Sequence, residues 1–145
     1  MNPAGPKVLL VEDSKAVRRS LAGILTDMGV PDSHIREAAD ARAAMEVFRA
    51  FRPDLVFLDI ELVPDPDRGE RNGRNGLPND GRPVADGDAI ALEMVAERPG
   101  TKVVIVSAFD GSDPRLKRVL ARGIHSVLPK PVRPSDVREI LASWK

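Results

Sequence analysis

The sequence DLVFLDIE, residues 54–61, decides the fold of this chain. The four apolar residues before Asp59 are rich in β-formers, and such a run predicts a strand buried on both faces of a parallel sheet. Asp59 follows with no turn residue before it. An ionised group at the end of a buried strand needs water, a metal or a charged partner. Ligands bind at the carboxyl ends of strands in open α/β sheets, so we expect Asp59 to be a reactive group at that edge.

Length and composition limit the class of protein. A length of 145 residues predicts one domain, residues 1–145, that ends soon after its last helix without an attached output domain. Basic and acidic residues balance at 22 each, so we expect neither a nucleic-acid nor a membrane partner. The chain has no cysteine, no apolar run near the ~18–20 residues of a membrane span and no signal-peptide core. These features fit a cytoplasmic protein.

The remaining periodicity alternates between strands and helices. Further short apolar runs predict strands at residues 7–11, 34–38, 102–106 and 126–128. Amphipathic stripes with N-cap residues, or with glycine or proline after them, predict helices over about 14–28, 40–52, 87–99, 113–122 and 134–144. Alternation of this kind indicates a parallel sheet with helices on both faces. We expect a doubly wound, five-stranded sheet of flavodoxin-like order 2-1-3-4-5.

Residues 62–85 interrupt this alternation. Proline, glycine, Asp, Arg and Asn dominate them, and they have almost nothing apolar to bury. A structureless loop of that length is uncommon in a compact domain. We expect an irregular, flexible insertion, either a tether or docking segment or a lid over Asp59. If it is a lid, deletion of residues 65–82 should speed the reactions of the Asp59 carboxylate; unchanged rates exclude it.

The expected strand order brings several polar side chains to one edge. Strands one and three are neighbours, which places Glu12 and Asp13 beside Asp59. Each close carboxylate pair repels by on the order of 4 kcal/mol at about 4 Å and an effective dielectric of 20. A divalent cation would neutralise them, and oxygen ligands that retain waters favour Mg²⁺. Asp59 is the candidate nucleophile for an acyl phosphate, with Lys130 and Ser107 supplying a cation and a hydroxyl for phosphoryl oxygens.

These residues resemble a known family. Val-Glu-Asp at 11–13, Leu-Asp at 58–59, Asp-Gly at 86–87, Ser-Ala at 107–108 and Lys-Pro at 130–131 occur in its order. The chain resembles a response-regulator receiver domain of two-component signalling, in the layout of single-domain chemotaxis regulators. The match extends from the first strand to the last helix.

The resemblance implies specific roles. Asp59 would accept a phosphoryl group from a histidine kinase or a histidine phosphotransfer protein. Glu12, Asp13, Asp59 and the main-chain carbonyl of Glu61 would hold Mg²⁺. Ser107 and Lys130 would contact the phosphoryl group, and the Lys130–Pro131 bond would be cis. Output would be contact with an unknown downstream protein through helix 113–122 and the last helix, without enzymatic activity beyond self-catalysed phosphorylation and dephosphorylation.

Three features depart from the family pattern. The loop after Asp59 is much longer than usual. Val127 stands where the family often has a switch Tyr or Phe. Glu61 and Phe109 border the path of the attacking water and should change the lifetime of the acyl phosphate.

Other interpretations remain open from the residues. Glu12 and Asp13 could be helix N-terminal acids, Ser107 a strand-end hydroxyl and Lys130 a solvated lysine. The chain could be a degenerate receiver that binds partners without phosphorylation. Two enzyme classes fit less well: a Toprim-like nuclease, through Glu12, Asp59 and Glu61, and a haloacid-dehalogenase-type phosphatase. His34 and His125 lack a metal-ligand companion, and the basic residues of helix 113–122 fit a solvated face.

Overall fold

A five-stranded parallel sheet forms the centre of the domain. The computed structural model describes residues 5–60, 87–107, 117 and 119–143. The strands are β1 (Val8–Val11), β2 (Ile35–Ala38), β3 (Leu55–Asp59), β4 (Lys102–Ser107) and β5 (Ser126–Pro129). Their order is β2-β1-β3-β4-β5, and every neighbouring pair is parallel. The predicted order is therefore confirmed.

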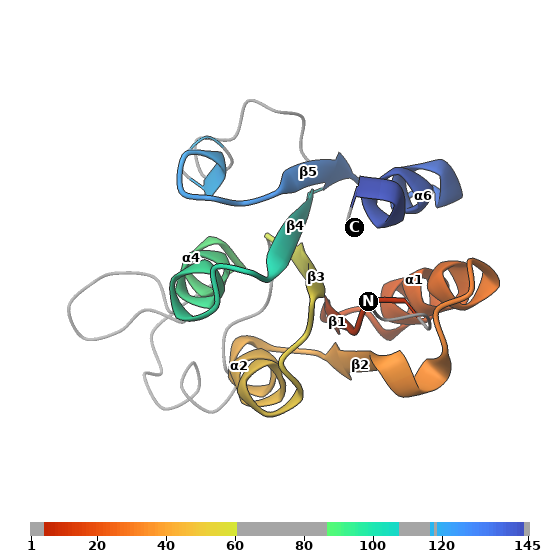
Figure 1. Ribbon diagram of the computed structural model, residues 1–145, viewed down its shortest axis with the longest axis horizontal. Coiled ribbons are helices and arrows are strands. Elements are labelled where there is room, and N and C mark those ends of the chain that lie inside the picture. Colours follow the sequence, from red (N-terminus) through yellow and green to blue (C-terminus); the bar gives the residue numbers. More distant parts are fainter. Residues whose placement is uncertain (1–4, 61–86, 108–116, 118, 144–145) are drawn as a thin grey trace.

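Helices cover both faces of the sheet. Figure 1 shows α1 (Lys15–Asp27) and α6 (Pro134–Ser143) together on one face. It shows α2 (Ala41–Phe51) and α4 (Gly87–Glu97) on the other. This two-layered covering is the doubly wound architecture expected from the sequence.

The core is split by the sheet into two apolar clusters. Leu55 and Phe57 of β3 belong to the cluster under α1 and α6, whereas Val56 and Leu58 belong to the cluster under α2 and α4. All residues of β3 are buried, Asp59 included. Successive side chains of a strand point to opposite faces, so a strand covered on both faces needs an uninterrupted apolar run.

Local chemistry sets the helix ends. The Ser14 hydroxyl accepts a hydrogen bond from the Val17 N–H at 3.3 Å, and the Asp40 carboxylate accepts one from the Ala43 N–H at 2.9 Å. Gly29, just after α1, has a φ of +98°. The left-handed cap of α2 is Arg52, with a φ of 55°. Pro53 was expected to close this helix, but the sequence contained no sign of a left-handed Arg before it.

Some boundaries differ from the expectation. A short 3-10 helix, Asp32–His34, precedes β2, so His34 does not belong to the strand. β5 extends to Pro129. Val119 and Leu120 were both expected on the buried side of the helix over 113–122, but only Val119 is buried, and Leu120 is 48% exposed. The insertion at 62–85, the helix start at 113–114 and Trp144 lie outside the described residues. In the described part of the chain, no helix is long and apolar enough to span a membrane.

Candidate functional site

Three carboxylates meet at the carboxyl edge of the sheet. In the register of β1 and β3, Val11 lies opposite Leu58, so the residues that follow are also neighbours. Carboxylate oxygens of Glu12, Asp13 and Asp59 all lie within 4.8 Å of one another. Glu12 and Asp59 are buried, whereas Asp13 is exposed. The cluster expected from the strand order is therefore present, and it reaches the surface through Asp13.

Lys130 supplies a cation to this cluster. Its Nζ lies 2.8 Å from Oε1 of Glu12 and 3.2 Å from Oδ2 of Asp59. Its own N–H donates to the carbonyl of Ser107 at 2.9 Å, which extends the pairing of β4 and β5. The Lys130–Pro131 peptide bond is cis, as expected. The ammonium group thus contacts two of the three carboxylates and is not a solvated surface lysine.

Ser107 reaches the same edge from β4. Asp59 lies opposite Val106 in the pairing of β3 and β4, so Ser107 lies one residue beyond Asp59. Ser107 is fully buried, with an exposed fraction of 0%. Ser107 therefore places a buried hydroxyl at the same edge of the sheet as the carboxylate cluster.

The charges of the cluster change its proton affinities. The pKa of Asp13 is raised to about 6 by its hydrogen bond with Glu12, by burial and by repulsion from Glu12 and Asp59. Burial raises the pKa of Glu12, but hydrogen bonds with Asp13, Lys130 and the Ser14 N–H outweigh burial and lower it overall. Burial lowers the pKa of Lys130, but Glu12 and Asp59 raise it overall. Of the two neighbouring acids Glu12 and Asp13, Asp13 is therefore the one that keeps a proton more readily.

The donor set fits a hard divalent cation. Three carboxylates lie close together and face one lysine, which leaves an excess of negative charge for a cation to balance. Carboxylate oxygens next to solvent are the ligands that suit Mg²⁺, which keeps several of its waters. The fourth expected ligand, the carbonyl of Glu61, lies outside the described residues, as does Phe109.

Gly87 packs against the main chain that follows Asp59. A Cβ on Gly87 would lie 2.3 Å from the carbonyl oxygen of Asp59 and 2.5 Å from Cα of Ile60. Such distances are incompatible with any side chain unless the backbone moves. The Asp-Gly pair was singled out in the sequence, but only the structure shows that its glycine is required by a close approach to the Asp59 carbonyl.

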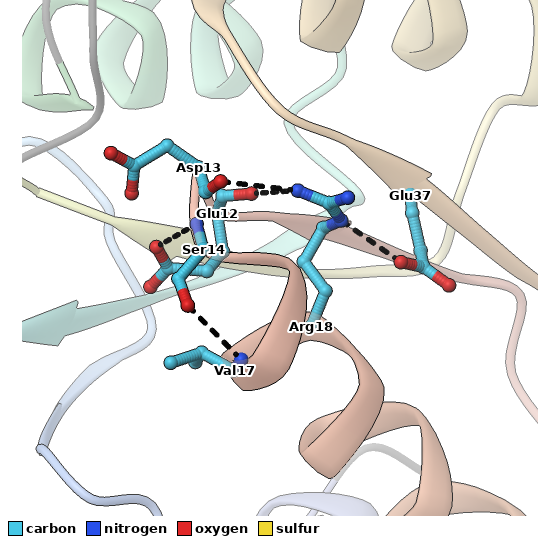
Figure 2. Close-up of polar contacts among 6 residues, drawn as sticks. All are labelled: Glu12, Asp13, Ser14, Val17, Arg18 and Glu37. Atoms are coloured by element: carbon cyan, nitrogen blue, oxygen red, sulfur yellow. Dashed lines mark hydrogen bonds and ion pairs between the residues drawn. The ribbon is translucent and has the colours of Figure 1, made fainter.

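Arg18 is a residue of the site that sequence reasoning missed. Its guanidinium donates to the carbonyl oxygen of Glu12 at 2.7 Å and to the carboxylate of Glu37 at 2.9 Å (Figure 2). A basic residue on an amphipathic helix usually belongs to a solvated face, and the sequence distinguishes Arg18 from Arg19 only by its spacing from the acidic pair.

Comparison with known proteins identifies the class. The family model of the response regulator receiver domain matches residues 8–67. Chemotaxis protein CheY of Thermotoga maritima is 29% identical over 137 residues, which cover 94% of this chain and 95% of the relative. The receiver domain of NtrX from Brucella abortus superposes with a TM-score of 0.72 at 26% identity, covering 94% of this chain and 96% of that one. In sequence and in fold, this chain matches response-regulator receiver domains.

Other relatives are much longer. Protein-glutamate methylesterase/protein-glutamine glutaminase 3 of Anaeromyxobacter dehalogenans is 32% identical over 147 aligned residues. The match covers 96% of this chain but 36% of that relative, so this chain spans about a third of its length. Vibrio cholerae chemotaxis protein CheY4 shares the fold, with a TM-score of 0.71 at 22% identity. The receiver domain is thus what this chain shares with these relatives. The comparisons favour a receiver over the nuclease and phosphatase interpretations.

Proposed function

We propose that this receiver accepts a phosphoryl group on Asp59 from a phosphohistidine of a histidine kinase or histidine phosphotransfer protein. One observation carries the proposal: Asp59 ends a buried strand with Lys130 Nζ 3.2 Å from its carboxylate and two further carboxylates within 4.8 Å. An isolated buried carboxylate would be costly. A carboxylate that is paired with a cation and lies beside a candidate metal site is suited to attack an electrophilic phosphorus.

The transfer exchanges one bond to phosphorus for another. A carboxylate oxygen of Asp59 forms a bond to phosphorus, and the P–N bond of the phosphohistidine breaks. The bonding electron pair leaves with the imidazole nitrogen. The ammonium group of Lys130 is placed to contact a phosphoryl oxygen, and the Ser107 hydroxyl to donate to another. Both groups come from strands on the same side of β3, so a phosphoryl group on Asp59 would contact the ends of β4 and β5.

The carboxylates of Glu12, Asp13 and Asp59, with the carbonyl of Glu61, would hold Mg²⁺ in this proposal. When bound, this cation neutralises negative charge on the phosphoryl oxygens. The arrangement supports this role, because three carboxylates lie within 4.8 Å of one another and one lysine cannot balance all of their charge. The fold holds the carboxylates of Glu12 and Asp59 in buried positions beside this candidate metal site.

The consequence of phosphorylation would be a protein contact. We infer that this receiver acts in the cytoplasm and signals to a downstream protein. Val127, at the position where the family often has a switch aromatic, packs partly buried against the cluster under α2 and α4. This valine favours a readout that differs from the aromatic switch, and it is the feature that keeps a phosphorylation-independent binding module as the second candidate.

The test uses chemical phosphodonors and an acyl-phosphate mimic. Acetyl phosphate with Mg²⁺ should add one phosphoryl group, detected by intact-protein mass spectrometry and lost in Asp59→Asn. Beryllofluoride with Mg²⁺ should raise the melting temperature of the wild type but not that of Asp59→Asn. If the wild type shows neither modification nor Mg²⁺ binding, the proposal fails and the phosphorylation-independent module replaces it.

A further inference from the structure

The junction between β1 and α1 carries two of the three carboxylates, and Arg18 spans it. Figure 2 shows the guanidinium of Arg18 between the main chain of Glu12 and Asp13 on one side and Glu37 of β2 on the other. Nη1 donates to the Glu12 carbonyl at 2.7 Å and, more weakly, to the Asp13 carbonyl at 3.5 Å. Nε donates to Oε1 of Glu37 at 2.9 Å. One side chain therefore joins the first helix, the acidic pair and the edge strand.

Glu37 is itself held in place by the sheet. It lies opposite Leu10 in the parallel pairing of β1 and β2. The side chain of Arg18 is 15% exposed, so its ion pair with Glu37 is partly shielded from water. Charge-assisted hydrogen bonds of this kind are stronger than those between neutral groups. Arg18 is thus anchored to a rigid element before it reaches the acidic pair.

The planar shape of the guanidinium gives this arrangement its geometry. Its Nε and Nη1 donors have a fixed relation, so holding Glu37 also fixes where the Glu12 carbonyl is bound. The carboxylate of Glu12 is held separately, by the Ser14 N–H at 2.9 Å and by Lys130 at 2.8 Å. Figure 2 shows the carboxylate of Asp13 pointing away from the guanidinium of Arg18. Arg18 therefore acts on the main chain of the acidic pair and leaves the carboxylate of Asp13 available.

Three carboxylates beside one ammonium group still repel one another, and this repulsion favours their separation until a divalent cation binds. The peptide units of Glu12 and Asp13 could relax outward to relieve that repulsion, because they lie past the end of β1. A clamp on their carbonyls opposes this relaxation, so the carboxylates stay close together before a cation arrives. Preorganisation of this kind increases affinity, since binding no longer has to reshape the site.

We propose that Arg18, anchored by Glu37, is a positioning residue for the binding of the divalent cation. Arg18 holds the main chain of Glu12 and Asp13, so that their carboxylates converge with that of Asp59. The inference rests on the proposed function. It assigns to α1 and the edge strand β2 a part in cation binding, although neither contributes a ligand. Partners that orient ligands in this way commonly change metal affinity by about 10–100-fold.

The experiment measures Mg²⁺ binding directly. Isothermal titration with MgCl₂ should show about tenfold weaker binding to Arg18→Met than to the wild type. Arg18→Lys should bind at an intermediate level, because an ammonium group cannot hold both the carbonyl and Glu37 at once. Arg19→Met is the matched control, since Arg19 is the exposed neighbour on the same helix. It should bind Mg²⁺ like the wild type.

A second control separates positioning from general destabilisation. Arg49→Met removes the ion pairs of Arg49 with Glu93 and Glu97, which join α2 to α4 away from the acidic pair. It should leave the Mg²⁺ dissociation constant unchanged. If Arg18→Met lowers the melting temperature but binds Mg²⁺ as tightly as the wild type, Arg18 is merely structural and the inference is wrong.

Glu37→Gln keeps the inference testable if Arg18→Met does not fold. It retains the size of the side chain but removes the charge that anchors Arg18, and it should weaken Mg²⁺ binding severalfold. Unchanged binding would overturn the inference. A wild type that takes up neither Mg²⁺ nor a phosphoryl group would overturn the proposed function, whereas a competent wild type with unaffected Arg18 and Glu37 variants overturns the positioning role alone.

Discussion

A methyl group on Gly87 would lie 2.3 Å from the main-chain oxygen of Asp59. The start of α4 is therefore pressed against the chain at the point where β3 ends and the candidate phosphoryl acceptor lies. Such a contact leaves no space for a side chain, and it links the position of α4 to the main-chain position of Asp59.

Gly87→Ala should consequently damage both stability and phosphorylation. We expect a loss of about 1–3 kcal/mol in the free energy of unfolding, because the backbone of Asp59 and Ile60 must move. Chemical denaturation measures this loss, and the initial rate of labelling by acetyl phosphate should fall with it. Gly23→Ala is the control: a Cβ there meets nothing within 4 Å. It should stabilise the protein by about 0.5–1 kcal/mol, as alanine does within a helix. If the two alanine variants had the same free energy of unfolding and the same labelling rate, the close contact of Gly87 with the main chain of Asp59 would be contradicted.

Ser107 offers a test of the hydroxyl at the end of β4. Ser107→Ala should fold normally, because alanine fits a buried serine position, but should slow phosphorylation of Asp59 by roughly 10–100-fold through loss of a donor to the phosphoryl group. Ser107→Thr keeps the hydroxyl and should retain more activity. Rates of phosphorylation by acetyl phosphate at saturating Mg²⁺ make the comparison. If the alanine variant reacted as fast as the wild type, Ser107 would be no more than a strand-end hydroxyl.

Lys130→Met should move two measurements in opposite directions. The ammonium group lies 2.8 Å from Glu12 and 3.2 Å from Asp59, so it competes with a divalent cation for the same carboxylates. At pH 8 its removal should tighten Mg²⁺ binding by roughly fivefold, equivalent to about 1 kcal/mol of Coulomb energy. Phosphorylation should fall, because the phosphoryl group loses its cation. Parallel loss of both properties would indicate a collapsed site and would count against this assignment.

The acidic pair predicts a particular pH dependence of stability without metal. The folded protein keeps a proton on Asp13 up to about pH 6, above the ordinary value of 3.8 at which the unfolded chain loses it. Between these values Asp13 binds more protons in the folded state, so its contribution to the free energy of unfolding should fall as the pH rises and then level off. The proton belongs to the Glu12–Asp13 pair as a unit.

Urea denaturation in EDTA at a series of pH values measures this dependence. Asp13→Asn should flatten the curve and should be more stable than the wild type at pH 7.5 without metal, because it removes one of three like charges. Mg²⁺ needs the ionised carboxylate, so Mg²⁺ affinity of the wild type should rise with pH through the same window. A wild-type curve as flat as that of the variant would refute the raised pKa.

The sequence by itself determined the strand order and the members of the carboxylate cluster. An apolar run such as residues 55–58 indicates a strand that is buried on both faces of the sheet. The alternation of such strands with helices leaves few possible sheet topologies. Residues at the carboxyl ends of neighbouring strands then have to meet, which is why Glu12, Asp13 and Asp59 could be placed together. The position of Lys130 at the end of the fifth strand followed from the same rule.

Only the tertiary structure decided how these residues are held. Periodicity describes one element at a time, whereas contacts between elements depend on register and on the rotation of each helix about its axis. For that reason nothing in the sequence shows that Arg18 reaches Glu12 and Glu37 while Arg19 remains exposed. The sequence also gives no sign that Gly87 lies against the Asp59 carbonyl, because that distance depends on how α4 packs on the end of β3.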